Sequence, residues 1–250
     1  MKLGCTSYVY PADAVSNAER LCGVTEDVEL LIFEGADREV LPTRADISRL
    51  REISASGGFS YTVHLPLDID VCSADPEFRG FSLKRAEEIT DLTATLEPRG
   101  FVLHLPGGEG EGWTERACRA VDRLISRARA DVFVENLTYP FSRLVPVFEQ
   151  TGARLCLDTG HAHKAGDDWR EIYRSFAGKT GVVHLYAPDP AGSDRHMGLQ
   201  HAPLGFVSAV TRALVESEYS GVLTIELFCE DDFFKSKEIV EREIEKWEKG

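Results

Sequence analysis

The sequence predicts a closed (β/α)8 barrel that occupies residues 1–250 as a single domain. Short apolar runs rich in β-branched residues recur eight times, and amphipathic stretches separate them. A chain of 250 residues has the length that eight such strand–helix units need. An open doubly wound sheet is the alternative. It would normally have fewer strands, and the first apolar run lacks the glycine-rich GxGxxG turn that would favour it.

The predicted strands are nearly continuous in apolar residues, as expected for parallel strands that are buried on both faces. They are Leu3–Cys5, Val28–Phe33, Tyr61–Leu65, Phe101–Leu105, Asp131–Leu137, Arg154–Leu157, Val182–Leu185 and Leu223–Phe228. The predicted helices are Ala14–Leu21, Arg44–Ala55, Lys84–Leu96, Thr114–Ala128, Phe141–Gln150, Trp169–Phe176, Phe206–Glu216 and Lys235–Lys249. The glycine-rich segment 107–112 directly follows a strand, so we interpret it as a loop at the barrel mouth rather than a linker.

Composition narrows the possible partners and the compartment. No apolar run is long enough to span a membrane, and the first residues lack the apolar core of a signal peptide, so we expect a cytoplasmic protein without a membrane partner. The six cysteines form no CxxC pair, and we interpret them as reduced. The net charge is −14, and no basic patch is evident in the sequence, so a nucleic-acid partner is not expected.

Polar residues recur at the ends of the predicted strands, or in the loops that follow them. Burying an unpaired charge costs several kcal/mol, so this repetition needs a common cause. The carboxyl ends of barrel strands form the active face, and imidazole with carboxylate is the ligand chemistry of Zn, Mn and Fe sites. The sequence therefore predicts a site for divalent metal. The candidate ligands are His64, His104, Glu135, Asp158, His161, His184, Asp194, His196 and Glu226.

These residues carry a family resemblance. The chain resembles the xylose isomerase-like TIM barrels, which include sugar epimerases and endonuclease IV-type enzymes. Members with one metal use the ligands that correspond to Glu135, Asp158, His184 and Glu226. The endonuclease IV type holds three metals and needs five further ligands, which this sequence has. The resemblance implies a first metal on His64, His104 and Glu135, a second on Glu135, Asp158, His184 and Glu226, and a third on His161, Asp194 and His196.

Charge favours a phosphoester substrate for such a site. Three divalent ions would outweigh the four carboxylates and leave a positive centre, which suits a phosphodiester anion. One ion with three carboxylates would leave a negative centre, which suits a neutral sugar. We therefore expect metal-dependent phosphodiester hydrolysis, with Zn as the expected metal and Mn or Fe as alternatives. Glu226 would orient the attacking water and Glu135 would bridge two ions, so these two are the predicted catalytic residues.

A closer resemblance suggests the substrate. The segments LGCTSYVYPAD, DVELLIFE, YTVHLPLDID, VLHLPGG, VENLTYPF and CLDTGH are similar to the CbiR family of cobamide-remodelling phosphodiesterases. This implies a corrinoid substrate that is cleaved in its nucleotide loop. Several aromatic residues could form an apolar rim for it, although most are expected to be core: Tyr8, Tyr10, Trp113, Tyr139, Phe141, Phe228, Phe233 and Phe234. A one-metal sugar isomerase or epimerase, an abasic-site endonuclease and a non-catalytic corrinoid-binding module remain alternatives.

Overall fold

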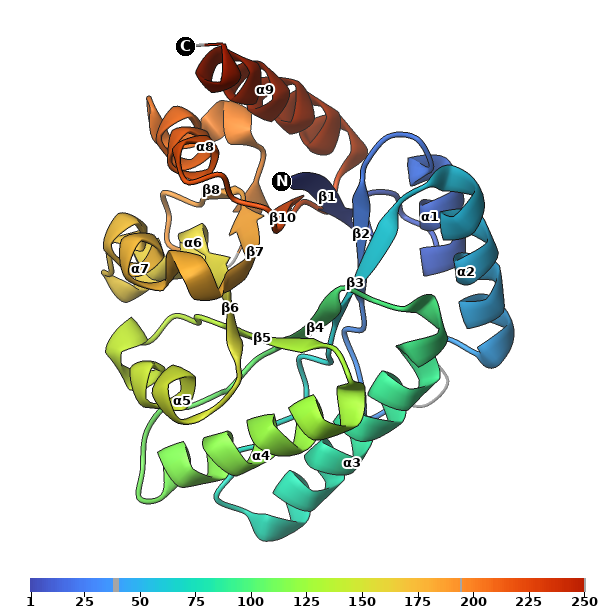
Figure 1. Cartoon of the computed structure of the whole chain (residues 1–250), viewed down its shortest axis with the longest axis vertical. Helices are drawn as coiled ribbons and strands as arrows, with labels where there is room; N and C mark the ends of the chain where they lie inside the picture. Colours follow the sequence, from blue (N-terminus) through green and yellow to red (C-terminus); the bar gives the residue numbers. More distant parts are fainter. Residues whose placement is uncertain (38–40, 194, 250) are drawn as a thin grey trace.

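The computed structural model describes residues 1–37, 41–193 and 195–249. Its barrel strands are β1 (Lys2–Thr6), β2 (Asp27–Leu31), β3 (Ser60–His64), β4 (Gly100–Leu103), β5 (Asp131–Glu135), β6 (Arg154–Asp158), β7 (Thr180–Leu185) and β10 (Val222–Ile225). They close into a barrel in the order β1-β10-β7-β6-β5-β4-β3-β2, and every neighbouring pair is parallel. The helices form a ring around it (Figure 1). The predicted (β/α)8 barrel is confirmed.

The helices follow the predicted order with shifted ends. They are α1 (Ala14–Leu21), α2 (Arg44–Gly57), α3 (Pro76–Thr93), α4 (Trp113–Ala128), α5 (Val145–Gln150), α6 (Thr159–Ala165), α7 (Trp169–Phe176), α8 (Phe206–Glu216) and α9 (Glu230–Glu248). Helix α3 begins at Pro76 rather than at Lys84, because Asp75 caps it and proline is tolerated in a first turn. Helix α9 begins at Glu230 rather than at Lys235, and acidic residues occupy its first turn.

The sequence did not predict two small elements at the mouth of the barrel. Helix α6 directly follows β6. A two-stranded antiparallel sheet follows β7 and joins β8 (Ala187–Pro188) to β9 (His196–Met197). The predicted helix Phe141–Gln150 is also divided, because a 3-10 turn at Phe141–Arg143 precedes α5, which carries proline in its first turn. These elements lie beside the candidate ligands of the second half of the chain.

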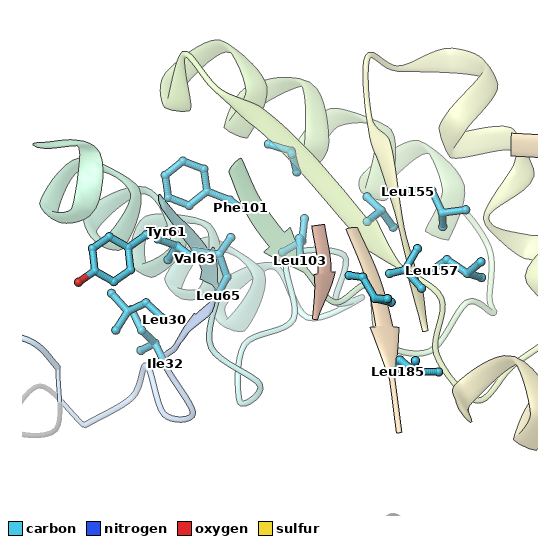
Figure 2. Close-up of a cluster of buried hydrophobic side chains, with 14 of the residues drawn as sticks. Leu30, Ile32, Tyr61, Val63, Leu65, Phe101, Leu103, Leu155, Leu157 and Leu185 are labelled. Carbon is cyan, nitrogen blue, oxygen red and sulfur yellow. The ribbon is translucent and has the colours of Figure 1, made fainter. Parts of the chain in front are cut away.

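Alternation along the strands separates an apolar outer face from a polar inner face. On β3, Tyr61 and Val63 belong to the hydrophobic layer between the strands and the helices, and Leu65 continues it beyond the strand (Figure 2). Thr62 and His64 alternate with them and therefore face the barrel interior. The strands are thus buried on both faces as predicted, but the interior is not uniformly apolar, because Thr62, Thr224 and Glu29 are fully buried there.

A small apolar cluster fills the interior beneath the mouth. It consists of Val102, Phe133, Cys156 and Val182. Each of these residues precedes His104, Glu135, Asp158 or His184 by two positions, so each shares a strand face with that candidate ligand. A Cβ atom on Gly181 would lie 2.1 Å from the Phe133 ring, so the cluster packs only because glycine stands there. The cluster forms an apolar floor under four of the candidate ligands, beside the buried Thr62 and Thr224.

No helix within the described ranges is long and apolar enough to cross a membrane. The six cysteines are free, and Cys22 and Cys229 are the two that are exposed.

Candidate metal centre

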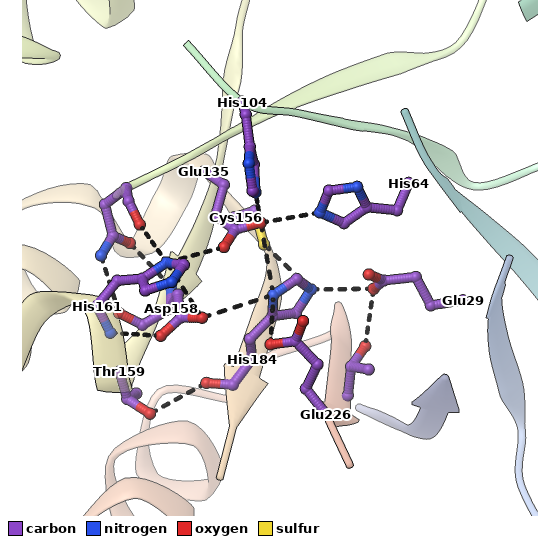
Figure 3. Close-up of polar contacts among 12 residues, drawn as sticks. Glu29, His64, His104, Glu135, Cys156, Asp158, Thr159, His161, His184 and Glu226 are labelled. Carbon is purple, nitrogen blue, oxygen red and sulfur yellow. Dashed lines mark hydrogen bonds and ion pairs between the residues drawn. The ribbon is translucent and has the colours of Figure 1, made fainter. Parts of the chain in front are cut away.

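The candidate ligands meet at the carboxyl end of the barrel, as a strand-end pattern predicts. His64, Glu135, Asp158 and His184 lie on β3, β5, β6 and β7. Residues His104 and Glu226 directly follow β4 and β10. Their side chains point toward one another in the barrel interior (Figure 3). The predicted ligand Asp194 lies outside the described residues.

One group of possible ligands combines two imidazoles with Glu135. The Nε2 atoms of His64 and His104 lie 3.2 and 3.1 Å from Glu135 Oε2, and the three side chains could hold a metal ion. The Nδ1 atom of His64 lies 2.8 Å from the carbonyl oxygen of Leu65. A carbonyl can only accept a hydrogen bond, so Nδ1 of His64 donates and Nε2 keeps the lone pair that a metal needs.

A second group joins Asp158, His184 and Glu226, and it provides a direct test of whether metal fits. Asp158 Oδ2, His184 Nδ1 and Glu226 Oε2 are buried without a well-formed hydrogen bond. The distance from His184 Nδ1 is 3.3 Å to Glu226 Oε2 and 3.9 Å to Asp158 Oδ2. Tetrahedral ligands about 2.1 Å from an ion are about 3.4 Å apart. Unsatisfied buried polar atoms at this spacing fit a divalent metal.

Glu29 belongs to the centre, and the sequence did not predict it. It lies on β2, is fully buried, and places Oε2 3.0 Å from His184 Nε2. Thr224 Oγ1 donates to the same oxygen at 3.3 Å. Because the carboxylate accepts from Nε2–H, His184 keeps its lone pair on Nδ1, the atom that faces Asp158 and Glu226. Cys156 Sγ lies 3.4 Å from His184 Nε2, so a thiol also borders this imidazole.

Asp158 positions His161 as well as facing His184 and Glu226. Its Oδ1 accepts a hydrogen bond of 2.6 Å from the backbone N–H of His161 and caps α6. The cap fixes the spacing of three residues between the aspartate and the histidine, because capping side chains bond the third residue of the helix. His161 Nδ1 then lies 3.1 Å from Glu135 Oε1, and these two residues with Asp158 form a further possible metal group.

His196 approaches the centre from the β8–β9 sheet. It pairs with Pro188 in that sheet, and its ring stacks on Tyr186 with centroids 3.7 Å apart. Its Nδ1 lies 3.1 Å from the carbonyl oxygen of Glu226 and must donate to it, which leaves the lone pair on Nε2. In the described part of the chain, His196 joins no group of three ligands. The third set implied by the resemblance is therefore not assembled from described residues.

The electrostatics of the centre demand positive charge. Burial alone would raise the pKa of Glu226, but neighbouring His184 and His196 lower it to about 2. Burial raises the pKa of Asp158 to about 6, aided by the carboxylates of Glu226 and Glu135 and opposed by His161. Burial would lower the pKa of His161, but Asp158 and Glu135 raise it to about 9. The shifts of Asp158 and His161 reflect crowded carboxylates, which favour a nearby cation, whereas the shift of Glu226 reflects the neighbouring imidazoles.

The mouth above the ligands is apolar. A cavity of about 320 Å³, here called the metal cavity, is bounded by six of the candidate ligands and by an apolar wall. The wall includes Phe33, Leu67 and Phe228, which are 37%, 43% and 43% exposed. Of the predicted aromatic rim, Phe228 lies here, whereas Tyr10, Trp113, Phe141 and Phe233 are buried core. Phe33 and Leu67 were not predicted to line the mouth.

Comparison with known proteins defines the class. Residues 25–249 match the family described as the xylose isomerase-like TIM barrel, so the chain belongs to that family. An uncharacterised protein of Methanocaldococcus jannaschii is 24% identical over 98% of this chain and 90% of its own length. A probable endonuclease 4 of Mycobacterium leprae is 30% identical, but the match covers only 57% of this chain and 62% of that protein.

The solved structures agree on the fold. A D-tagatose 3-epimerase-like protein superposes with a TM-score of 0.80 at 20% identity, over 100% of this chain and 99% of the other. Identity this low shows the fold alone. The family and the probable endonuclease 4 relative indicate an enzyme, whose reaction depends on the side chains of the centre rather than on the fold.

Proposed function

We propose that the protein is a metal-dependent phosphodiesterase that hydrolyses the phosphodiester in the nucleotide loop of a cobamide. The observation that carries this proposal is the presence of two ligand groups, one that contains Glu135 and one that lies beside it. His64 and His104 approach Glu135 from one side, while Asp158, His184 and Glu226 make a complete group beside it. A one-metal barrel would have no use for His64 and His104 as ligands.

The residues that would hold metal follow from these groups. His64, His104 and Glu135 would hold one ion, and Asp158, His184 and Glu226 would hold a second with Glu135 between them. We propose His161, Asp194 and His196 for a third. Divalent ions bound there supply Lewis-acid activation of water and of phosphate oxygens. Zn, Mn and Fe all accept these ligands, and we propose Zn.

The chain's own residues then orient the reaction. Glu226 keeps a low pKa and stays ionised, so it can accept a hydrogen bond from the attacking water and aim it at phosphorus. The water oxygen forms the new bond to phosphorus, the bond from phosphorus to the nucleoside oxygen breaks, and a proton moves to that oxygen. Glu135 contacts His64, His104 and His161 and holds the three imidazoles around one carboxylate.

Charge and surface chemistry support a phosphodiester that carries a large apolar body. Glu29 adds a further carboxylate to the four predicted ones, but it is paired with His184, and three divalent ions would still leave the centre positive. Three of the six large apolar side chains that are exposed in the described residues line the metal cavity. The net charge of −14 opposes binding to the backbone of duplex DNA.

Incubation of the metal-loaded protein with adenosylcobalamin tests the proposal. We expect chromatography to show a released nucleoside and a cobinamide that retains the phosphate. Absence of product with Zn, Mn and Fe would contradict the cobamide assignment. The homologous probable endonuclease 4 favours one second candidate, cleavage at abasic sites. Nicking of an abasic duplex without cleavage of adenosylcobalamin would establish that candidate instead.

A further inference from the structure

A second cavity adjoins the metal cavity and has no role in the proposed chemistry. This side cavity has a volume of about 450 Å³, a size typical of small-molecule sites. It lies between the carboxyl end of β2 and the first turns of α1 and α2. Leu31, Ile32 and Phe33 line both cavities. Because Phe33 is exposed at the common edge of the two cavities, a substituent on a phosphodiester held in the metal cavity would reach the side cavity by passing over this ring.

A row of aromatic rings connects the two cavities. Phe228 lies 5.4 Å from the ring of His196, Phe33 lies 6.0 Å from Phe228, and Tyr8 lies 4.7 Å from Phe33. These centroid separations are those at which aromatic rings attract one another. Phe33 and Phe228 remain more than a third exposed, although burial of such rings is favourable. The row therefore offers stacking surface from the metal centre into the side cavity.

The charged side chains of the described cavity lining are all carboxylates. They are Asp13, Glu34 and Asp46. Asp13 caps α1 and Asp46 completes the capping box of α2, so both are held in place at the edge of an otherwise apolar wall. An anionic group would be repelled here, and the leucine, isoleucine and phenylalanine side chains favour contact with an apolar or aromatic group.

We infer that the side cavity is a subsite for a flat aromatic group that is uncharged or cationic. The inference rests on the proposed function, under which this group is the base of the nucleoside that hydrolysis releases. The ring of Tyr8 would stack on the base, Phe33 would separate the base from the phosphate, and the carboxylates would exclude a neighbouring phosphate of a polynucleotide. The same cavity that accepts the leaving group thus disfavours nucleic acid.

Binding of three bicyclic probes to the metal-loaded protein tests the subsite. Indole is neutral, N-methylquinolinium is cationic and naphthalene-2-sulfonate is anionic. We expect NMR titration to give similar affinities for the first two and affinity at least about tenfold lower for the anion. Tyr8→Ala should weaken binding of indole by about 5- to 150-fold, the range expected for loss of one stacking partner. Equal binding of the anion, or no effect of Tyr8→Ala, would overturn the inference.

Phe78→Ala is a matched control, because Phe78 is 40% exposed and lines neither cavity. It should leave probe binding unchanged, and thermal unfolding verifies that both variants are folded. The two proposals fail separately. Indole binding that depends on Tyr8, without cleavage of adenosylcobalamin, would contradict the phosphodiesterase function and support the subsite. Cleavage of adenosylcobalamin with a KM that is unchanged in Tyr8→Ala would contradict the subsite and support the phosphodiesterase function.

Discussion

Two regions of the barrel mouth contribute to the metal centre in different ways. Strands β6, β7 and β10 bring Asp158, His184 and Glu226 together as a complete ligand group, whose unsatisfied atoms face one another. Strands β3 and β4 bring only His64 and His104, which need Glu135 to form a group. The first region would serve any metal-binding barrel. Under the proposed function the second region would hold a further ion, and in that case it would distinguish phosphodiester hydrolysis from sugar chemistry.

The largest effect is expected in the first region. His184→Ala removes an imidazole that contacts four carboxylates and leaves their charges crowded. We expect loss of bound metal and a fall in phosphodiesterase activity of more than about a hundredfold, the upper range for loss of a ligand's outer partner. Elemental analysis and hydrolysis of bis(p-nitrophenyl) phosphate measure the two effects. The imidazole of His201 lies outside the metal groups, so His201→Ala is the control. Full metal content in His184→Ala would exclude His184 as a ligand.

Removal of the two imidazoles of the second region should show whether each region binds its own metal ion. In His64→Ala with His104→Ala, we expect the protein to lose one metal equivalent while Asp158, His184 and Glu226 retain theirs. Phosphodiester hydrolysis should fall by about a hundredfold, because one of the ions that activate water and phosphate is gone. Metal content per chain, measured before and after dialysis, checks this. Unchanged metal content with unchanged activity would mean that the two imidazoles are structural.

A smaller effect is expected at Glu29, which contacts the metal centre only through His184. Glu29→Gln keeps the shape but removes the charge that favours a proton on His184 Nε2. We expect metal affinity to fall by about 10- to 100-fold, as for other partners of ligating histidines. Competition with a chelator measures the affinity. Thr224→Val removes the hydroxyl that donates to Glu29, and it should have a weaker effect; an equal effect would argue against a special role for the carboxylate.

The smallest effect on the centre is expected at Asp27, a buried carboxylate of the barrel interior that belongs to no metal group. Burial, opposed by hydrogen bonds from Ser60 and Thr62, raises its pKa to about 7. Between pH 4 and 7 the folded chain keeps a proton that the unfolded chain releases, so stability falls as pH rises, by about 1.4 kcal/mol for each pH unit at most. Asp27→Asn should flatten this dependence in chemical denaturation while metal content stays unchanged. A denaturation profile with the same slope would contradict the assignment.

The sequence predicted those residues of the centre that stand at the end of an apolar run. His64, His104, Glu135, Asp158, His184 and Glu226 were found because each ends an apolar run, and the geometry of parallel strands then brings them together. Glu29 was missed because it stands inside the run DVELL, where neighbouring apolar residues conceal a side chain that faces the interior. The alternation of Asp27 and Glu29 was the available signal, since residues two apart share a strand face.

Other features of the structure depend on contacts between side chains that no local sequence pattern predicts. Helix α6 was missed because Asp158 was interpreted only as a ligand, and not as the residue that caps a helix. Phe33 was not assigned to the mouth because its exposure depends on the position of Tyr8 and Phe228, which come from the two ends of the chain. Periodicity placed α1, α7 and α8 at their observed bounds, where capping and apolar spacing agree.

The two carboxylate oxygens of Asp158 link the metal centre to a backbone amide whose hydrogen exchange can be measured. Oδ1 holds the first turn of α6, and Oδ2 faces His184. A cation that draws Oδ2 toward itself must also tighten or relax the bond to the amide of His161. Exchange of that amide hydrogen with solvent should therefore slow or quicken with metal concentration, and a single backbone position would follow occupancy of the site without any substrate present.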